Sequence, residues 1–173
     1  MYKLRELERN DVKKLNEWRN KPELINMLGA PFRYINSEVD FAWFDNYMKS
    51  RSSNVRCAIL DGNDEFIGVV SLTNINTINQ SAEFHIMIGD EGSQNKGAGT
   101  YATKSMLSHA FENLNLNRIE LTVLVDNYRA IKMYEKIGFR KEGELRNIYY
   151  KNGNFKNAYI YSILKEEYII NKK

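Results

Sequence analysis

The sequence predicts an α+β domain built around one mixed, twisted β-sheet of about seven strands, flanked by about four helices. Two observations favour this class: apolar residues alternate along several short segments, as in half-buried strands, and recur at helical spacing along others. The 173 residues contain no internal repeat and no Pro/Ser-rich linker. Residues 1–173 are therefore expected to form a single domain with its own core.

The expected strands lie between turn signals, and two of these turns join hairpins. The turn at residues 61–64 reads Asp-Gly-Asn-Asp, and Asn152-Gly153 separates the last two apolar runs. The predicted strands are residues 2–7, 55–60, 65–72, 82–88, 118–125, 142–150 and 155–164.

The expected helices begin at capping residues. Asn10 or Asp11 is expected to cap the first helix, which Pro22 closes or kinks. Ser37 and Asp40 form a capping-box pattern at the start of the second helix. The predicted helices are residues 10–20, 36–50, 100–113 and 128–137.

Composition excludes several classes of function. The 25 Lys and Arg residues are interspersed with 22 Asp and Glu residues, so nucleic acid is not an expected partner. No apolar run approaches the roughly 20 residues that a membrane-spanning helix needs, and no export signal is visible, so we expect a cytoplasmic protein without a membrane partner. The two histidines have no metal-ligand spacing, and no metal site is expected. Cys57 sits in an apolar run typical of a buried small hydrophobe rather than a nucleophile.

A glycine-rich turn at residues 92–99 separates a strand that ends near Ile88 from a helix that starts near Thr100. Gly97 and Gly99 lack Cβ atoms, so the backbone amides can approach a ligand closely. The free amides and dipole at the helix start favour an anion, and phosphate or pyrophosphate is the natural ligand. The spacing matches neither the P-loop nor the Rossmann motif, and a glycine turn can also simply reverse the chain.

The pattern Gln94-x-x-Gly97-x-Gly99, followed by residues 126–139 (DNYRAIKMYEKIGF), resembles the GNAT superfamily of acetyl-CoA-dependent N-acetyltransferases. The resemblance covers nearly the whole chain and is densest over residues 82–139. It implies that acetyl-CoA is the cosubstrate and that the glycine turn cradles its pyrophosphate. The family often has a proline shortly before the glutamine, whereas this chain has the residues GDEGS.

The same resemblance implies particular cofactor-binding residues. The strand at Ile86, Met87 and Ile88 is expected to pair its backbone with the pantetheine arm. Asn127, Ala130 and Tyr134 match the second family motif, as do Gly138 and Phe139, and Tyr134 is implied as the general acid that protonates the coenzyme A sulfur. Arg129 and Lys136 could meet the nucleotide phosphate or could be exposed helix charges. The loop residues expected to bind the cofactor are Gln94, Asn95, Lys96, Gly97, Ala98, Gly99 and Thr100.

Strand alternation suggests a general base. It places Glu83, His85 and Met87 on one face of their strand and the neighbouring apolar residues on the other. Glu83 could take the proton of the amine, through water, while His85 helps or orients the substrate, although Glu83 could also be a solvated carboxylate. In ribosomal-protein alanine acetyltransferases a glutamate lies at the position that matches Thr122 here, so the base stays open between these residues and a water chain.

The sequence constrains the amine less well. Residues 82–88 and 142–164 look similar to spermidine N-acetyltransferases, but the acidic cluster of those enzymes is absent from residues 25–37. Residues 17–23 are similar to acetyltransferases that act on nucleotide-linked amino sugars and on ribosomal proteins. Four aromatic residues could line a substrate pocket together with Glu83, or could belong to the core: Trp18, Phe32, Tyr34 and Trp43.

Two classes of function therefore stay open. The first is an acetyltransferase for a primary amine, either of a small molecule of the polyamine or amino-sugar type or of a protein N-terminus. The second is a non-catalytic sensor that binds acetyl-CoA. The retained Tyr134 favours the enzyme, because a sensor needs the loop but no proton donor. A homo-oligomer is left open.

Overall fold

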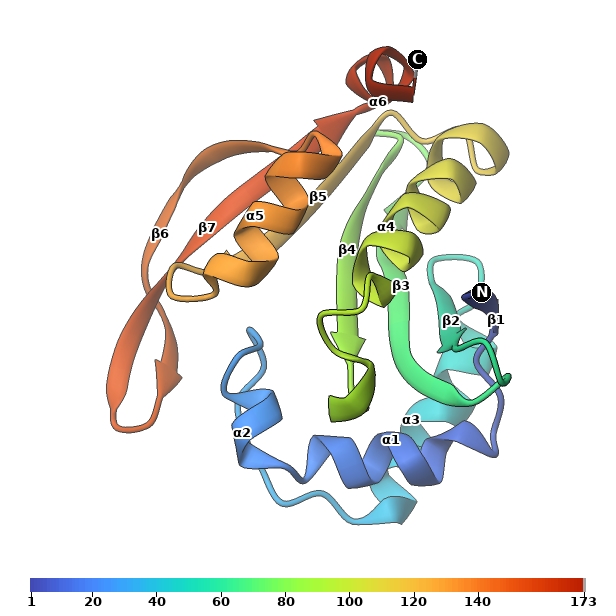
Figure 1. Ribbon diagram of the computed structural model, residues 1–173, viewed down its shortest axis with the longest axis vertical. Helices are drawn as coiled ribbons and strands as arrows, with labels where there is room; N and C mark the ends of the chain where they lie inside the picture. The colour runs from blue at the N-terminus through green and yellow to red at the C-terminus, as the bar shows by residue number, and fades with distance from the viewer. Residues whose placement is uncertain (173) are drawn as a thin grey trace.

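The computed structural model describes residues 1–172 and contains a seven-stranded mixed sheet with helices on both faces (Figure 1). The order of the strands across the sheet is β1-β2-β3-β4-β5-β7-β6. Each predicted strand is confirmed, with ends that differ by a few residues. The strands are β1 (Lys3–Glu6), β2 (Val55–Leu60), β3 (Phe66–Asn76), β4 (Ser81–Ile88), β5 (Arg118–Leu124), β6 (Arg140–Lys151) and β7 (Asn154–Leu164).

All four predicted helices are confirmed, and the structure adds a short second helix and a C-terminal helix. A 3₁₀ turn (Glu91–Ser93) precedes α4, and a π-helical turn (His109–Asn113) follows it. The helices are α1 (Asp11–Arg19), α2 (Pro22–Ile25), α3 (Ser37–Lys49), α4 (Ala98–Ser108), α5 (Tyr128–Ile137) and α6 (Lys165–Lys172). No helix within residues 1–172 is both long and apolar enough to cross a bilayer.

Two expected helix boundaries are corrected by the structure. Asn36, rather than Ser37, caps α3: its backbone is extended, and its side-chain oxygen accepts the Glu38 amide at 2.7 Å. Pro22 does not close the first helix, which already ends at Arg19. It occupies the first position of α2, where its missing N–H would have no helical partner.

The two faces of the sheet bury separate apolar clusters. Alternation along β4 sends Phe84, Ile86 and Ile88 into the cluster beneath α4 and α5, whereas Met87 packs against the cluster beneath α1 and α3. This division of β4 agrees with the predicted alternation. Glu83 and His85 therefore lie on the α1/α3 face, opposite the helices that follow the glycine turn.

The strands β4 and β5 are joined by a crossover through α4 and run parallel, whereas the other neighbouring strands of residues 1–172 are antiparallel. Only three residue pairs connect them: Ser81 with Arg118, Ala82 with Ile119 and Glu83 with Glu120. Beyond these pairs the two strands separate, as Figure 1 shows. The sheet is therefore open in its middle, between β4 and β5.

Candidate functional site

The separation of β4 and β5 leaves backbone groups without strand partners. β4 continues to Ile88 and β5 to Leu124, but neither is paired with the other beyond Glu83 and Glu120. An unpaired strand edge presents a row of N–H and C=O groups that can hydrogen-bond an extended ligand with amides of its own. The gap can therefore hold a chain such as the pantetheine arm, beside the predicted residues Ile86, Met87 and Ile88.

The glycine turn lies at the start of α4 and leaves its amides free. Gly97 occupies the N-cap in the left-handed region (φ 93°), which a residue without Cβ adopts without strain. A Cβ at this position would enter open space, and no side chain caps the helix. The first-turn amides of Ala98, Gly99 and Thr100 therefore point at a site that suits an anion.

Side chains from distant segments brace this turn. Gln94 Nε2 donates to the Ile88 carbonyl at 3.2 Å, which ties the turn to the end of β4. Arg129 donates to Gln94 Oε1 at 3.1 Å and to Asn95 Oδ1 at 3.3 Å, and the Tyr2 hydroxyl donates to the Lys96 carbonyl at 2.8 Å. Arg129 thus places a cation beside the free amides. Lys136 is exposed.

Tyr134 lies where β4 and β5 begin to separate. Its ring packs edge-on against Phe84, the first β4 residue beyond the last pair with β5, and against Phe139. The side chain is buried, and its hydroxyl is not among the fully buried polar atoms of residues 1–172 that lack a partner. Burial raises the pKa of this phenol, so it keeps its proton at neutral pH. A protonated phenol at the gap can donate to a ligand atom there.

Asn127 positions the start of the helix that carries Tyr134. Its Oδ1 accepts the Ala130 amide at 3.2 Å and so caps α5. Its Nδ2 donates to the Met27 carbonyl at 3.1 Å, in the loop between α2 and α3. Asn127 therefore links the second family motif to an N-terminal segment 100 residues away.

Glu83 and His85 lie together on the opposite face of β4. Their side chains approach to 3.6 Å, between His85 Nε2 and Glu83 Oε2. Asn74 donates to Glu83 Oε1 at 3.0 Å, and Thr73 Oγ1 lies 3.0 Å from His85 Nε2. Desolvation lowers the pKa of His85, with Arg56 adding to the effect and Glu83 opposing it, so the imidazole is neutral at neutral pH. This pair can accept a proton from a group that enters the gap from the α1/α3 side.

Trp18 lies in the core, whereas a part for the other aromatic residues in a substrate pocket stays a prediction. Trp18 is 3% exposed and packs against Phe66 in the core, and its ring fills the place that a Cβ on Gly89 would take. Tyr34 is 89% exposed, with the half-buried Phe32 as its ring partner. The expectation for Trp18 is wrong because a large apolar ring on the inner side of α1 gains more from burial than from lining a cleft.

The structure brings two β6 residues, Tyr149 and Lys151, into contacts that the sequence analysis did not predict. Tyr149 on β6 lies close enough to Glu83 for the carboxylate to raise its pKa, after the larger effect of burial. Lys151 on β6 is buried and donates to the carbonyls of Ile25 and Ala30. No sequence signal marks the contacts of Lys151, because its partners lie 126 and 121 residues away.

Other reactive groups lie away from this arrangement. Burial raises the pKa of the Cys57 thiol to about 11, which suits a packing role rather than a nucleophile. Within residues 1–172 no group of three His, Cys, Asp or Glu side chains is placed to hold a metal ion.

Comparison with known proteins agrees with the geometry of the gap. A family model described as an acetyltransferase (GNAT) domain matches residues 2–140. A spermidine N(1)-acetyltransferase of Escherichia coli is 32% identical over 99% of this chain and 90% of its own length. A putative ribosomal N-acetyltransferase of Bacillus subtilis is 37% identical over 58% of this chain and 55% of its own.

A solved structure extends the likeness to the whole fold. The spermidine N-acetyltransferase of Vibrio cholerae, in complex with CoA and spermine, superposes with a TM-score of 0.89 at 30% identity. The match covers 97% of this chain and 98% of the other.

Proposed function

Because the chain belongs to the GNAT family of acetyltransferases, we propose that it moves an acetyl group from acetyl-CoA directly to a primary amine of a small molecule of the polyamine class. The observation that carries the proposal is the unpaired β4/β5 gap, with free α4 amides at one end and Tyr134 beside it. The relatives named for spermidine acetylation support the polyamine class.

The residues present fit coenzyme A. The open space beside Gly97 and the free first-turn amides suit its pyrophosphate, and Arg129 adds a positive charge. The unpaired edge of β4 suits its pantetheine amides. The backbone of residues 86–88 and 94–100 would hold the cofactor, and Asn127 and Ala130 would frame it at the start of α5.

Acetyl-CoA supplies an activated thioester when it is bound. The acceptor must lose a proton before or during attack, and Glu83 takes this proton, through water, while the neutral His85 helps to orient the acceptor. Tyr134 donates its phenolic proton to the departing sulfur, so the gain and loss of protons balance. The gap in the sheet allows groups on the two faces of β4 to act on one carbonyl.

The burial of Cys57 supports direct transfer in a ternary complex rather than through an acetylated cysteine. Cys57 is the one cysteine of the chain, and burial raises the pKa of its thiol. An acetylated cysteine intermediate would need a thiolate beside the thioester. We also place the reaction in the cytoplasm as part of this proposal, which suits an enzyme with a free thiol.

The test is a thiol-release assay with acetyl-CoA and a panel of spermidine, an amino sugar and a peptide with an N-terminal alanine. We expect spermidine to have the highest kcat/KM. Preferred turnover of the peptide would instead support N-terminal acetylation, which the ribosomal relative favours. Tight acetyl-CoA binding by calorimetry without any turnover would identify a sensor.

A further inference from the structure

Lys151 is a buried cation without a carboxylate partner. Its side chain is 5% exposed, and no carboxylate of the described residues lies within ion-pair distance of its Nζ. Two backbone carbonyls satisfy it instead: those of Ile25, at 3.0 Å, and of Ala30. A buried ammonium is costly unless it is well hydrogen-bonded, so its position calls for an explanation.

Both carbonyls belong to one short stretch of chain. Ile25 ends α2, and Ala30 lies five residues later in the α2–α3 loop, which we define as residues 26–36. A lysine at the end of β6 therefore binds both flanks of the first turn of this loop. The contact joins the N-terminal part of the chain to the C-terminal hairpin.

The same turn contacts two residues of the proposed active site region. The Met27 carbonyl accepts from Asn127, the cap of the helix that carries Tyr134. Gly29 lies directly against Tyr149: a Cβ on Gly29 would be 2.8 Å from the Tyr149 hydroxyl. Tyr149 is in turn close enough to Glu83 to feel its charge. The turn at residues 26–30 thus lies between the start of α5 and the neighbourhood of the proposed base.

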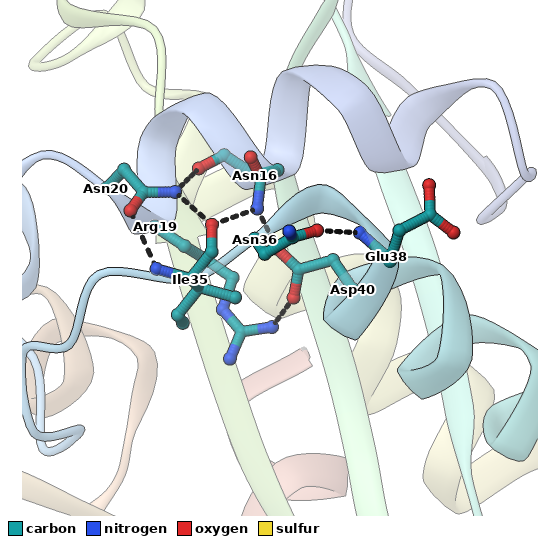
Figure 2. A network of polar contacts seen from close by, with 7 residues as sticks. All are labelled: Asn16, Arg19, Asn20, Ile35, Asn36, Glu38 and Asp40. Carbon is teal, nitrogen blue, oxygen red and sulfur yellow. Dashed lines mark hydrogen bonds and ion pairs between the residues drawn. The ribbon is translucent and has the colours of Figure 1, made fainter.

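The far end of the loop is held by a separate polar network, shown in Figure 2. The Asn20 side chain pairs with both backbone groups of Ile35, at 2.8 and 2.9 Å. Asn16 donates to the Ile35 carbonyl at 3.0 Å and to the fully buried Asp40 at 2.7 Å. The base of the loop is therefore fixed by neighbouring helices, whereas its active-site end depends on Asn127 and Lys151.

We propose that Lys151 is a positioning residue for the acceptor amine: it holds residues 26–30 against β6, and this turn forms a wall of the amine site beside Tyr149 and Glu83. The inference rests on the proposed acetyltransferase function. Lys151 itself is buried and does not touch the substrate. It acts by ordering a loop whose other contacts reach both Asn127 and Tyr149.

The experiment replaces the ammonium by a thioether of similar length, Lys151→Met. We expect KM for the amine to rise about tenfold, as for the loss of hydrogen bonds to a charged group, with kcat and acetyl-CoA affinity changed less than about twofold. Hydrogen exchange should be faster at the amides of Met27 and Leu28, in the freed turn. This second readout does not need turnover, so it separates failure of this inference from failure of the proposed function.

A matched control is Lys14→Met. Lys14 also donates to a backbone carbonyl, that of Phe66 at 2.7 Å, but it lies on α1 and its bond goes to the start of β3 rather than to the α2–α3 loop. Its replacement should leave the amine KM and the exchange of the turn unchanged. If Lys14→Met raised the amine KM as much as Lys151→Met, the effect would be general destabilisation and the inference would be overturned.

A second variant keeps the inference testable if Lys151→Met folds poorly. Asn20→Ala loosens the base of the same loop and should also raise the amine KM, by about threefold, without changing acetyl-CoA affinity. Unchanged amine KM and unchanged exchange of the turn in a folded Lys151→Met protein would overturn the inference. A loss confined to kcat would also overturn it, because it would place the role of Lys151 in the chemical step.

Discussion

The proposed cofactor side and the proposed amine side of the gap are built in different ways. On the cofactor side, the groups proposed to bind belong to the backbone: the free edge of β4 and the first-turn amides of α4, shaped by Gly97. On the amine side, the surfaces come from side chains that join distant segments, as Lys151 joins β6 to the α2–α3 loop. The first construction suits one ligand used by a whole family, whereas the second can change with single substitutions while the fold stays intact.

The largest expected effect is on kcat, from a substitution of Tyr134, which lies between the two sides. Tyr134→Phe keeps the ring that packs on Phe84 and removes only the hydroxyl. Because general acid catalysis contributes about 10²–10⁴-fold and coenzyme A is a fair leaving group, we expect kcat to fall about 100-fold. Acetyl-CoA affinity and amine KM should change little. Steady-state kinetics with calorimetric titration measure all three, and a parent-like kcat with chemistry rate-limiting would show that Tyr134 only packs.

The second effect is confined to the cofactor side. Gly97→Val puts a β-branched residue at φ 93° and fills the open space next to the helix amides. Because the valine side chain would crowd a pyrophosphate at the α4 amides, we expect acetyl-CoA affinity to fall about 30-fold. The left-handed strain, about 1–3 kcal/mol, should lower the free energy of unfolding without unfolding the domain. Calorimetry on the folded variant is the measurement. Parent-like affinity would remove the α4 amides from the cofactor site.

The features that the sequence predicts, and those that it does not, also differ between the cofactor side and the amine side. The strands, the four longer helices and the glycine turn are local patterns, and the structure has them nearly where they are expected. Glu83, His85 and Tyr134 could be selected because alternation and a sequence motif specify their faces. Trp18 could not be assigned correctly, since the pattern does not distinguish a core ring from a pocket ring. Lys151 could not be found at all, because its partners lie 121 and 126 residues away.

A smaller change tests the amine side alone. Gly29→Ala adds a Cβ that would lie 2.8 Å from the Tyr149 hydroxyl, and the ring must move away. The far end of a tyrosine can give way, so we expect only about a threefold rise in the amine KM. Acetyl-CoA affinity should stay at the parent value, which is the opposite of the Gly97→Val result. A change in both affinities would mean that the two sides are not independent.

The smallest expected effect concerns the ion pair that holds the β6–β7 hairpin to β5. Glu142 on β6 accepts from Arg118 at 2.6 and 2.7 Å and from Ser162 at 2.6 Å. These hydrogen bonds lower the pKa of Glu142 from 4.5 to about 2, and the bonds from Arg118 have the largest effect. A carboxyl group whose pKa is lower in the folded protein than in the unfolded chain stabilises the folded protein at pH values above its unfolded pKa. This stabilisation is lost as pH falls from about 4.5 toward about 2.

Glu142→Gln should therefore reduce the free energy of unfolding at pH 7, and the difference from the parent protein should shrink as the pH falls through that window. The pair is partly exposed, so we expect a difference below about 1 kcal/mol, measured by urea unfolding at several pH values. Glu144→Gln on the same strand is the matched control, because Glu144 accepts from Asn157 and has no arginine partner among the described residues. If the loss of unfolding free energy in Glu142→Gln stays constant from pH 7 to pH 3, the charge of Glu142 does not stabilise the hairpin that carries Tyr149 and Lys151.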